Sequence, residues 1–155
     1  MDGKQNLKIE ASLQIGKSAS EVYEAIVNPD HMQNYFISES NGRMESGKDL
    51  VWKFPEFKSS YPIHVEKLTV NKSIRFRWDF KTKNVGLIVE IRLKELGENQ
   101  TIITISEKEM NQDEIGLKWL QNNSQGWANF LACLKAYLEF GINLRKGGFD
   151  YLRES

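Results

Sequence analysis

The feature that most constrains the fold is one long amphipathic segment near the C-terminus. Over residues 117–138, apolar side chains recur every three or four positions, which places them on one face of a helix. Gly141 follows this pattern and is typical of a helix end. A lone amphipathic helix must bury its apolar face against another layer. The stripe consists of Leu117, Leu120, Ser124, Trp127, Leu131, Leu134 and Leu138.

Segments with a period of two precede this helix and provide that layer. The clearest is 74–80, where Ile74, Phe76, Trp78 and Phe80 alternate with polar residues. Because the connections are short, and parallel strands need long crossovers, we expect an antiparallel meander. The other expected strands are 7–15, 42–47, 50–54, 61–70, 85–93 and a strand from 101 to 107.

Two short helices are expected after the first strand. Ser18 and Glu21 form a capping box, and Asn28-Pro29 ends the first helix. Asp30 can cap a second helix that continues to Phe36. The predicted fold is α+β: a curved antiparallel sheet of six to seven strands around a long C-terminal helix. We expect a single domain over 1–155, with its core at about 7–141 and a tail at 142–155.

The charge balance argues against two classes of partner. The chain of 155 residues has 21 Lys and Arg against 21 Asp and Glu, so its formal net charge is zero. A nucleic-acid binder usually has a basic excess, and a membrane-surface helix has clustered basic residues opposite apolar ones. We therefore expect no nucleic-acid binding and no membrane insertion. The basic residues Arg145, Lys146 and Arg153 are interpreted as part of a solvated tail.

The single cysteine and the N-terminal residues indicate the cellular compartment in which the protein is expected. Cys133 excludes an internal disulfide and is expected to be a small core residue. The first eight residues are polar and lack the apolar core of a secretory signal. Together these features lead us to expect a soluble cytoplasmic protein.

Several short motifs, taken in order, resemble a known superfamily. The order resembles the START-like, helix-grip superfamily, also called SRPBCC. Within it, the chain is similar to the group around the activator of heat-shock-protein-90 ATPase homologue 1, over nearly the whole of 7–139. Tyr35 stands where that group usually has Trp. The motifs are 20–26 followed by Asn28-Pro29-Asp30-His31-Met32, then Tyr35-Phe36, Gly42-Arg43-Met44 with Gly47, Ile74-Arg75-Phe76-Arg77-Trp78, and Gly126-Trp127 followed by Leu131, Leu134, Tyr137, Leu138 and Glu139.

The resemblance implies the fold and leaves the activity open. The superfamily includes lipid carriers, aromatic-polyketide cyclases and hormone receptors, and one fold supports many functions. The family name implies a co-chaperone-like role. The eukaryotic activators carry an additional N-terminal domain, and 155 residues are too few for both domains.

The polar residues suggest no catalytic set, no metal site and no cofactor. His31 and His64 lie far apart, without the spacing of a zinc site, and we expect His31 to pack in the hinge and His64 to face solvent. No phosphate-binding loop or Gly-x-Ser-x-Gly motif is present. Glu107 is the best polar candidate, because the period of two places it inward with Ile103 and Ile105. The alternative is that the strand ends at 106 and Glu107 lies in water.

These observations favour a ligand pocket between sheet and helix. Glu107 near one end and Ser124 on the helix are its expected polar groups, although Ser124 could instead allow close approach of the helix to the sheet. Ligand sites are mostly apolar with a few placed polar groups. Ordinary core packing is the alternative for the aromatic residues. The expected apolar wall is Trp52, Phe54, Phe76 and Trp78 from the sheet, with Trp127, Leu131 and Leu134 from the helix.

Three functions remain open at this point. The first is non-enzymatic binding of a small apolar or amphipathic ligand. The second is a co-chaperone-like protein-interaction domain, and the third is a polyketide-cyclase-like or hydrolase enzyme that uses a pocket carboxylate. A continuous cavity favours binding or catalysis, whereas a filled core with an exposed apolar patch favours a protein partner. The chain is expected to be a monomer or a homodimer.

Overall fold

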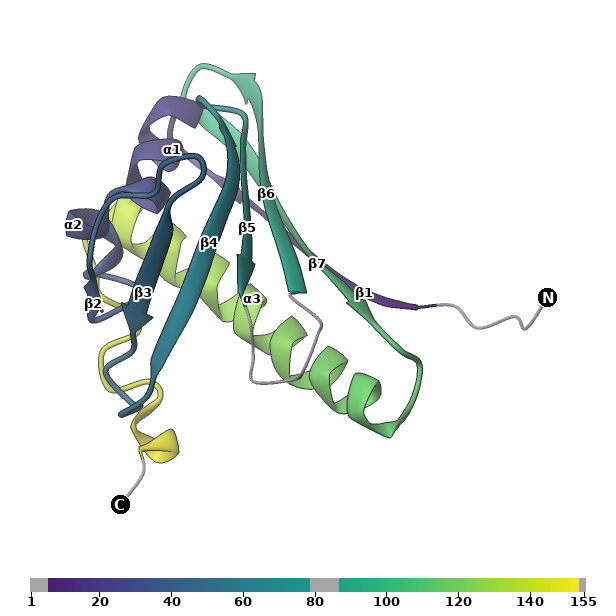
Figure 1. The fold of residues 1–155 in the computed structure, drawn as a ribbon. Helices are drawn as coiled ribbons and strands as arrows, with labels where there is room; N and C mark the ends of the chain where they lie inside the picture. Colours follow the sequence, from purple (N-terminus) through teal and green to yellow (C-terminus); the bar gives the residue numbers. More distant parts are fainter. Residues whose placement is uncertain (1–5, 79–86, 154–155) are drawn as a thin grey trace.

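The structure, a computed structural model, describes residues 6–78 and 87–153, and in this part a curved sheet lies against one long helix (Figure 1). Seven strands, three α-helices and a final 3-10 turn are found in the described part. The elements are β1 (Leu7–Ile15), α1 (Ala19–Val27), α2 (Pro29–Met32), β2 (Glu39–Ser40), β3 (Asp49–Lys53), β4 (Ser60–Thr69), β5 (Ser73–Trp78), β6 (Leu87–Gly97), β7 (Gln100–Met110), α3 (Glu114–Phe140) and η1 (Asp150–Leu152).

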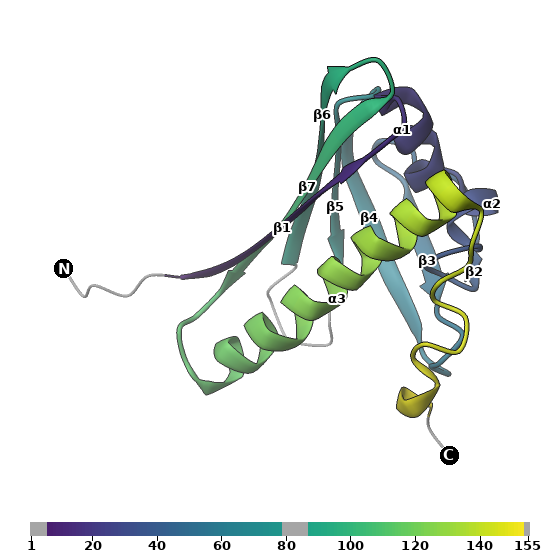
Figure 2. The same cartoon turned by 180° about the vertical axis from the view of Figure 1, so that it is seen from behind.

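The strands form one antiparallel sheet in the order β1-β7-β6-β5-β4-β3-β2. From β2 to β7 the sheet is a meander, as the short connections predict. The first strand returns to the far edge, where Ile15 pairs with Thr101 of β7. Helix α3 crosses one face of this sheet diagonally (Figure 2). The predicted α+β helix-grip architecture is therefore confirmed.

Helix α3 contains the whole predicted stripe at 117–138 and begins three residues before it, at Glu114. Its N-cap is Asp113, whose carboxylate accepts a hydrogen bond from the backbone N–H of Gly116 at 2.8 Å. Glycine is required at 116, since a Cβ there would lie 1.8 Å from the carbonyl oxygen of Asn111. The helix ends at Gly141, which has a φ of 65°. Leu117 is 52 % exposed, because the first turns of α3 extend beyond the ends of β5 and β6 (Figure 2).

The short elements after β1 differ from the prediction in two places. The capping by Ser18 is confirmed, but α2 is capped by Asn28 rather than by Asp30, and it ends at Met32. The chain then turns and buries Phe36. The expected strand at 42–47 is wrong, because Gly47 has a φ of 82°, which is incompatible with an extended strand. The short pairing with β3 is made instead by Glu39–Ser40.

The inner face of the sheet forms the core with α3. Trp52, Phe76, Leu131 and Leu134 are almost completely buried. The concave face is thus largely filled by side chains rather than enclosing one large central cavity. The expected strand positions Phe80 and Val85 lie outside the described residues. No helix in the described part of the chain has the length and hydropathy needed to cross a membrane. The basic side chains of the opposite face are exposed: Arg75, Arg77, Arg92 and Lys94.

Candidate functional site

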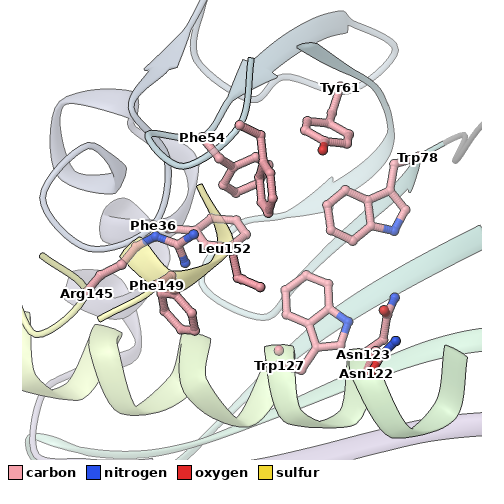
Figure 3. Close-up of a pocket in the computed structure, with 12 residues that line it drawn as sticks. Phe36, Phe54, Tyr61, Trp78, Asn122, Asn123, Trp127, Arg145, Phe149 and Leu152 are labelled. Carbon is pink, nitrogen blue, oxygen red and sulfur yellow. The ribbon is translucent and has the colours of Figure 1, made fainter. Parts of the chain in front are cut away.

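An apolar pocket of about 300 Å³ lies at one end of the layer between sheet and helix (Figure 3). It is bounded by the ends of β3, β4 and β5, by the middle of α3, and by the segment 142–153 that follows the helix. Seven of the twelve described residues that line it are aromatic. They are Phe36, Phe54, Phe57, Tyr61, Trp78, Asn122, Asn123, Gly126, Trp127, Arg145, Phe149 and Leu152.

The aromatic wall consists of rings from distant parts of the chain that contact one another. Trp78 at the end of β5 lies against Trp127 of α3, with ring centroids 5.5 Å apart. Phe54 packs edge-on against Tyr61 at 5.4 Å and against Phe36 at 5.2 Å. Edge-on and offset contacts of this kind stabilise aromatic clusters beyond the area they bury. The wall is therefore preformed rather than dependent on a ligand.

Glu107 lies behind this wall at one end and fixes the two tryptophans. Its side chain is fully buried, and both carboxylate oxygens accept hydrogen bonds. The indole N–H of Trp78 donates to Oε2 at 2.8 Å, and the indole N–H of Trp127 donates to Oε1 at 2.9 Å. The Nδ2 of Asn123 also donates to Oε1, at 3.0 Å. The prediction that Glu107 faces inward is confirmed, and the alternative that it lies in water is wrong.

Arg145 marks the other end of the pocket (Figure 3). Its guanidinium donates to Glu56 with an N–O distance of 2.5 Å, and the two side chains are 14 % and 4 % exposed. The same guanidinium lies 4.6 Å from the ring centroid of Phe149 and 5.6 Å from that of Phe54, within the range of cation–π attraction. The interpretation of Arg145 as part of a solvated tail is wrong, because its charge neutralises a buried carboxylate. Lys146 and Arg153 are exposed, as expected.

The predicted site residues divide into three groups in the structure. Phe54, Trp78 and Trp127 line the pocket. Glu107 lies behind it as the acceptor for the indoles, and Ser124 does not line it. Ser124 is one position, or about 100° of helix rotation, away from Asn123, which does face the pocket. The remaining predicted residues, Trp52, Phe76, Leu131 and Leu134, belong to the filled core.

Sequence reasoning missed most of the pocket rim. The prediction of a solvated tail overlooks Phe149 and Leu152, apolar residues that indicate packing rather than a free end. On α3, the spacing of four residues also places Asn122 beside Gly126 and Asn123 beside Trp127. The missed lining residues are Phe36, Phe57, Tyr61, Asn122, Asn123, Gly126, Arg145, Phe149 and Leu152.

The other candidate chemical groups lie outside this pocket. Burial raises the pKa of the Cys133 thiol, so this cysteine lacks the lowered pKa of a reactive thiolate. His31 shares a hydrogen bond of 2.6 Å with the hydroxyl of Tyr137, and His64 is exposed beside Asp49. Among residues 6–78 and 87–153, no group of three or more His, Cys, Asp or Glu side chains could hold a metal ion.

Solved structures with the same fold are numerous, and three illustrate their range. The protein SSP2350 from Staphylococcus saprophyticus is 29 % identical, with a TM-score of 0.77 over 90 % of this chain and 96 % of that one. The solution structure of the Aha1 dimer from Colwellia psychrerythraea is 21 % identical, with a TM-score of 0.75 over 87 % and 98 %. DynU16, described as a putative protein in the dynemicin biosynthetic locus, is 21 % identical, with a TM-score of 0.76 over 87 % and 48 %. The two structures at 21 % identity show a shared fold only.

The sequence also matches a protein family directly. The profile of the family described as "Activator of Hsp90 ATPase homolog 1-like protein" covers residues 17–139, from just before α1 to the last turn of α3. No curated protein matches the chain. The profile spans most of the chain and agrees with the resemblance found in the sequence motifs. The chain therefore belongs to the Activator of Hsp90 ATPase homolog 1-like protein family.

Proposed function

We propose that this protein binds a small, largely apolar aromatic molecule in the pocket bounded by Trp78, Trp127 and the segment 142–153. The observation that carries the proposal is the preformed aromatic wall, in which both indoles are held by a carboxylate outside the pocket. Protein sites for small molecules are mostly apolar, usually preformed and begin at about 300 Å³, so this pocket suits a compact ligand. The proposed unit is the whole chain as one domain, because its tail supplies part of the wall.

The contacts of Glu107 argue against the enzymatic alternative. A general acid or base must reach the proton that it transfers. Glu107 is fully buried and uses both oxygens to accept N–H groups from Trp78, Trp127 and Asn123. Its observed role is to position the wall, and we therefore propose binding without catalysis.

A second candidate, a protein-interaction domain, is supported by a different observation. Phe140, the last residue of α3, and Ile142, two residues further on, are 66 % and 53 % exposed. Leu144 and Tyr151 on the following segment are 53 % and 71 % exposed. Exposed apolar side chains that gather on one segment are common at protein interfaces. The protein-interaction function becomes the favoured one if the pocket binds no small molecule.

The ligand proposal is tested by filling the pocket from α3. Gly126 lines the pocket, and a Cβ there would meet nothing within 4 Å, so a side chain can start from this position without moving the backbone. We expect N-phenyl-1-naphthylamine, a neutral fluorescent probe, to bind the native protein with roughly micromolar affinity, about −8 kcal/mol. Gly126→Phe should reduce that affinity at least tenfold.

The matched control is Ala128→Phe, two residues further along α3. Ala128 is exposed and does not line the pocket, so this substitution adds the same ring to the same helix elsewhere. We expect probe affinity to be unchanged in this variant. Absence of probe binding to the native protein, or equal binding by both phenylalanine variants, contradicts the proposal.

A further inference from the structure

At the inner end of the pocket, the side chains that carry N–H groups share one acceptor. Three side chains there carry N–H groups, those of Trp78, Trp127 and Asn123, and each donates one hydrogen bond to Glu107. Glu107 itself is fully buried behind the wall. A ligand that enters the pocket therefore finds both indole N–H groups already used.

Glu107 also determines which way the Asn123 amide points. A carboxylate only accepts hydrogen bonds, so it must face the NH₂ group of an amide rather than its oxygen. The contact is made by Nδ2 of Asn123 at 3.0 Å. The carbonyl oxygen, Oδ1, is then held on the other side of the amide. Among the residues that the structure describes, no donor is found for this oxygen, and Asn123 lines the pocket.

We infer that the pocket selects aromatic ligands that carry a hydrogen-bond donor on the ring, such as a phenolic hydroxyl, and that Asn123 Oδ1 accepts from this donor. The inference rests on the proposed binding function and narrows its ligand class. An oxygen with a fixed orientation needs no reorganisation to accept a hydrogen bond, which favours selectivity. A site built to pair with a hydroxyl also discriminates against analogues that lack it, because the acceptor is then left unpaired.

Two ligands of similar shape test the inference. 2-Naphthol carries the donor, and 2-fluoronaphthalene replaces the hydroxyl with a fluorine of similar size that cannot donate. Both are measured by displacement of N-phenyl-1-naphthylamine. Since the fluorinated compound is the more hydrophobic, an ordinary apolar pocket would prefer it. We expect the native protein to bind 2-naphthol about tenfold more tightly.

Asn123→Leu removes the acceptor and should reverse this preference in favour of 2-fluoronaphthalene. Asn129→Leu is the matched control, because it makes the same substitution on α3 at a residue that does not line the pocket; it should keep the preference for 2-naphthol. If Asn123→Leu does not fold, the relative affinities of native protein for 2-naphthol and 2-fluoronaphthalene still test the inference. Tighter or equal binding of 2-fluoronaphthalene by native protein overturns the inference while the binding function stands. Failure of N-phenyl-1-naphthylamine and both naphthalenes to bind overturns both.

Discussion

Glu107 and Glu56, the two carboxylates at opposite ends of the pocket, are stabilised in different ways. Both are buried, and a buried charge is costly unless it is paired or hydrogen-bonded. Glu107 is surrounded by neutral N–H donors from β5 and α3, whereas Glu56 pairs with the guanidinium of Arg145. The neutral donors connect elements of the core, and the ion pair attaches a terminal segment. Removing the hydrogen bonds of Glu107 should therefore have different consequences from removing the ion pair of Glu56.

The largest effect is expected from Glu107→Leu. Two indole N–H groups and one amide lose their acceptor within a packed core, and each unsatisfied buried donor costs about 1–3 kcal/mol. We expect the free energy of unfolding, from urea denaturation, to fall by about 3–5 kcal/mol. Glu10→Leu on the neighbouring strand β1 is the control, because Glu10 is exposed; it should change stability by less than about 0.5 kcal/mol. A loss below about 1 kcal/mol for Glu107→Leu would show that the donors find other partners.

A smaller and more local effect is expected from Arg145→Met. Glu56 then lacks its cation, and the segment 142–153 can leave the surface instead of burying an unpaired charge. We expect faster amide exchange in this segment, measured by mass spectrometry, and a global stability loss of only about 1–2 kcal/mol. Probe affinity should also fall, since Phe149 and Leu152 leave the pocket wall.

The double variant Glu56→Gln with Arg145→Met tests whether the segment 142–153 is released by the unpaired charge of Glu56 or by the lost contacts of Arg145. Removing both charges relieves the unpaired carboxylate, so exchange in 142–153 should slow again relative to Arg145→Met alone. Unchanged protection of the segment in the single variant would mean that its apolar contacts alone hold it.

The smallest effect is expected from Gly126→Ala, which contacts neither carboxylate. The added methyl group meets nothing within 4 Å, and alanine favours a helix over glycine by about 1 kcal/mol. We expect a stability gain of about 0.5–1 kcal/mol in urea denaturation, the same in native protein and in Arg145→Met. A gain that disappears in the Glu107→Leu background would show that α3 shifts when Glu107 is lost.

The sequence was sufficient for features that depend on local periodicity. Alternation along β7 placed Glu107 inward, and the helical stripe placed Trp127 beside it. Ser124 was predicted as the polar group of the helix, whereas Asn123 lines the pocket. Which of the two faces the pocket depends on the rotation of α3 about its axis, which is set by contacts with distant strands. Arg145 was misplaced for a related reason, since its partner Glu56 is 89 residues away in the chain.

The position of β1 at the edge beside β7 has a consequence for the rate of folding. Ser12 on β1 and Thr104 on β7 bond to each other although they are 92 residues apart. Closing so long a loop has an entropic cost that precedes the gain from pairing, and such contacts slow folding. This domain should fold more slowly than a helical bundle of equal length. Until β1 docks, β7 presents an unpaired strand edge, which is the kind of surface on which partly folded chains aggregate.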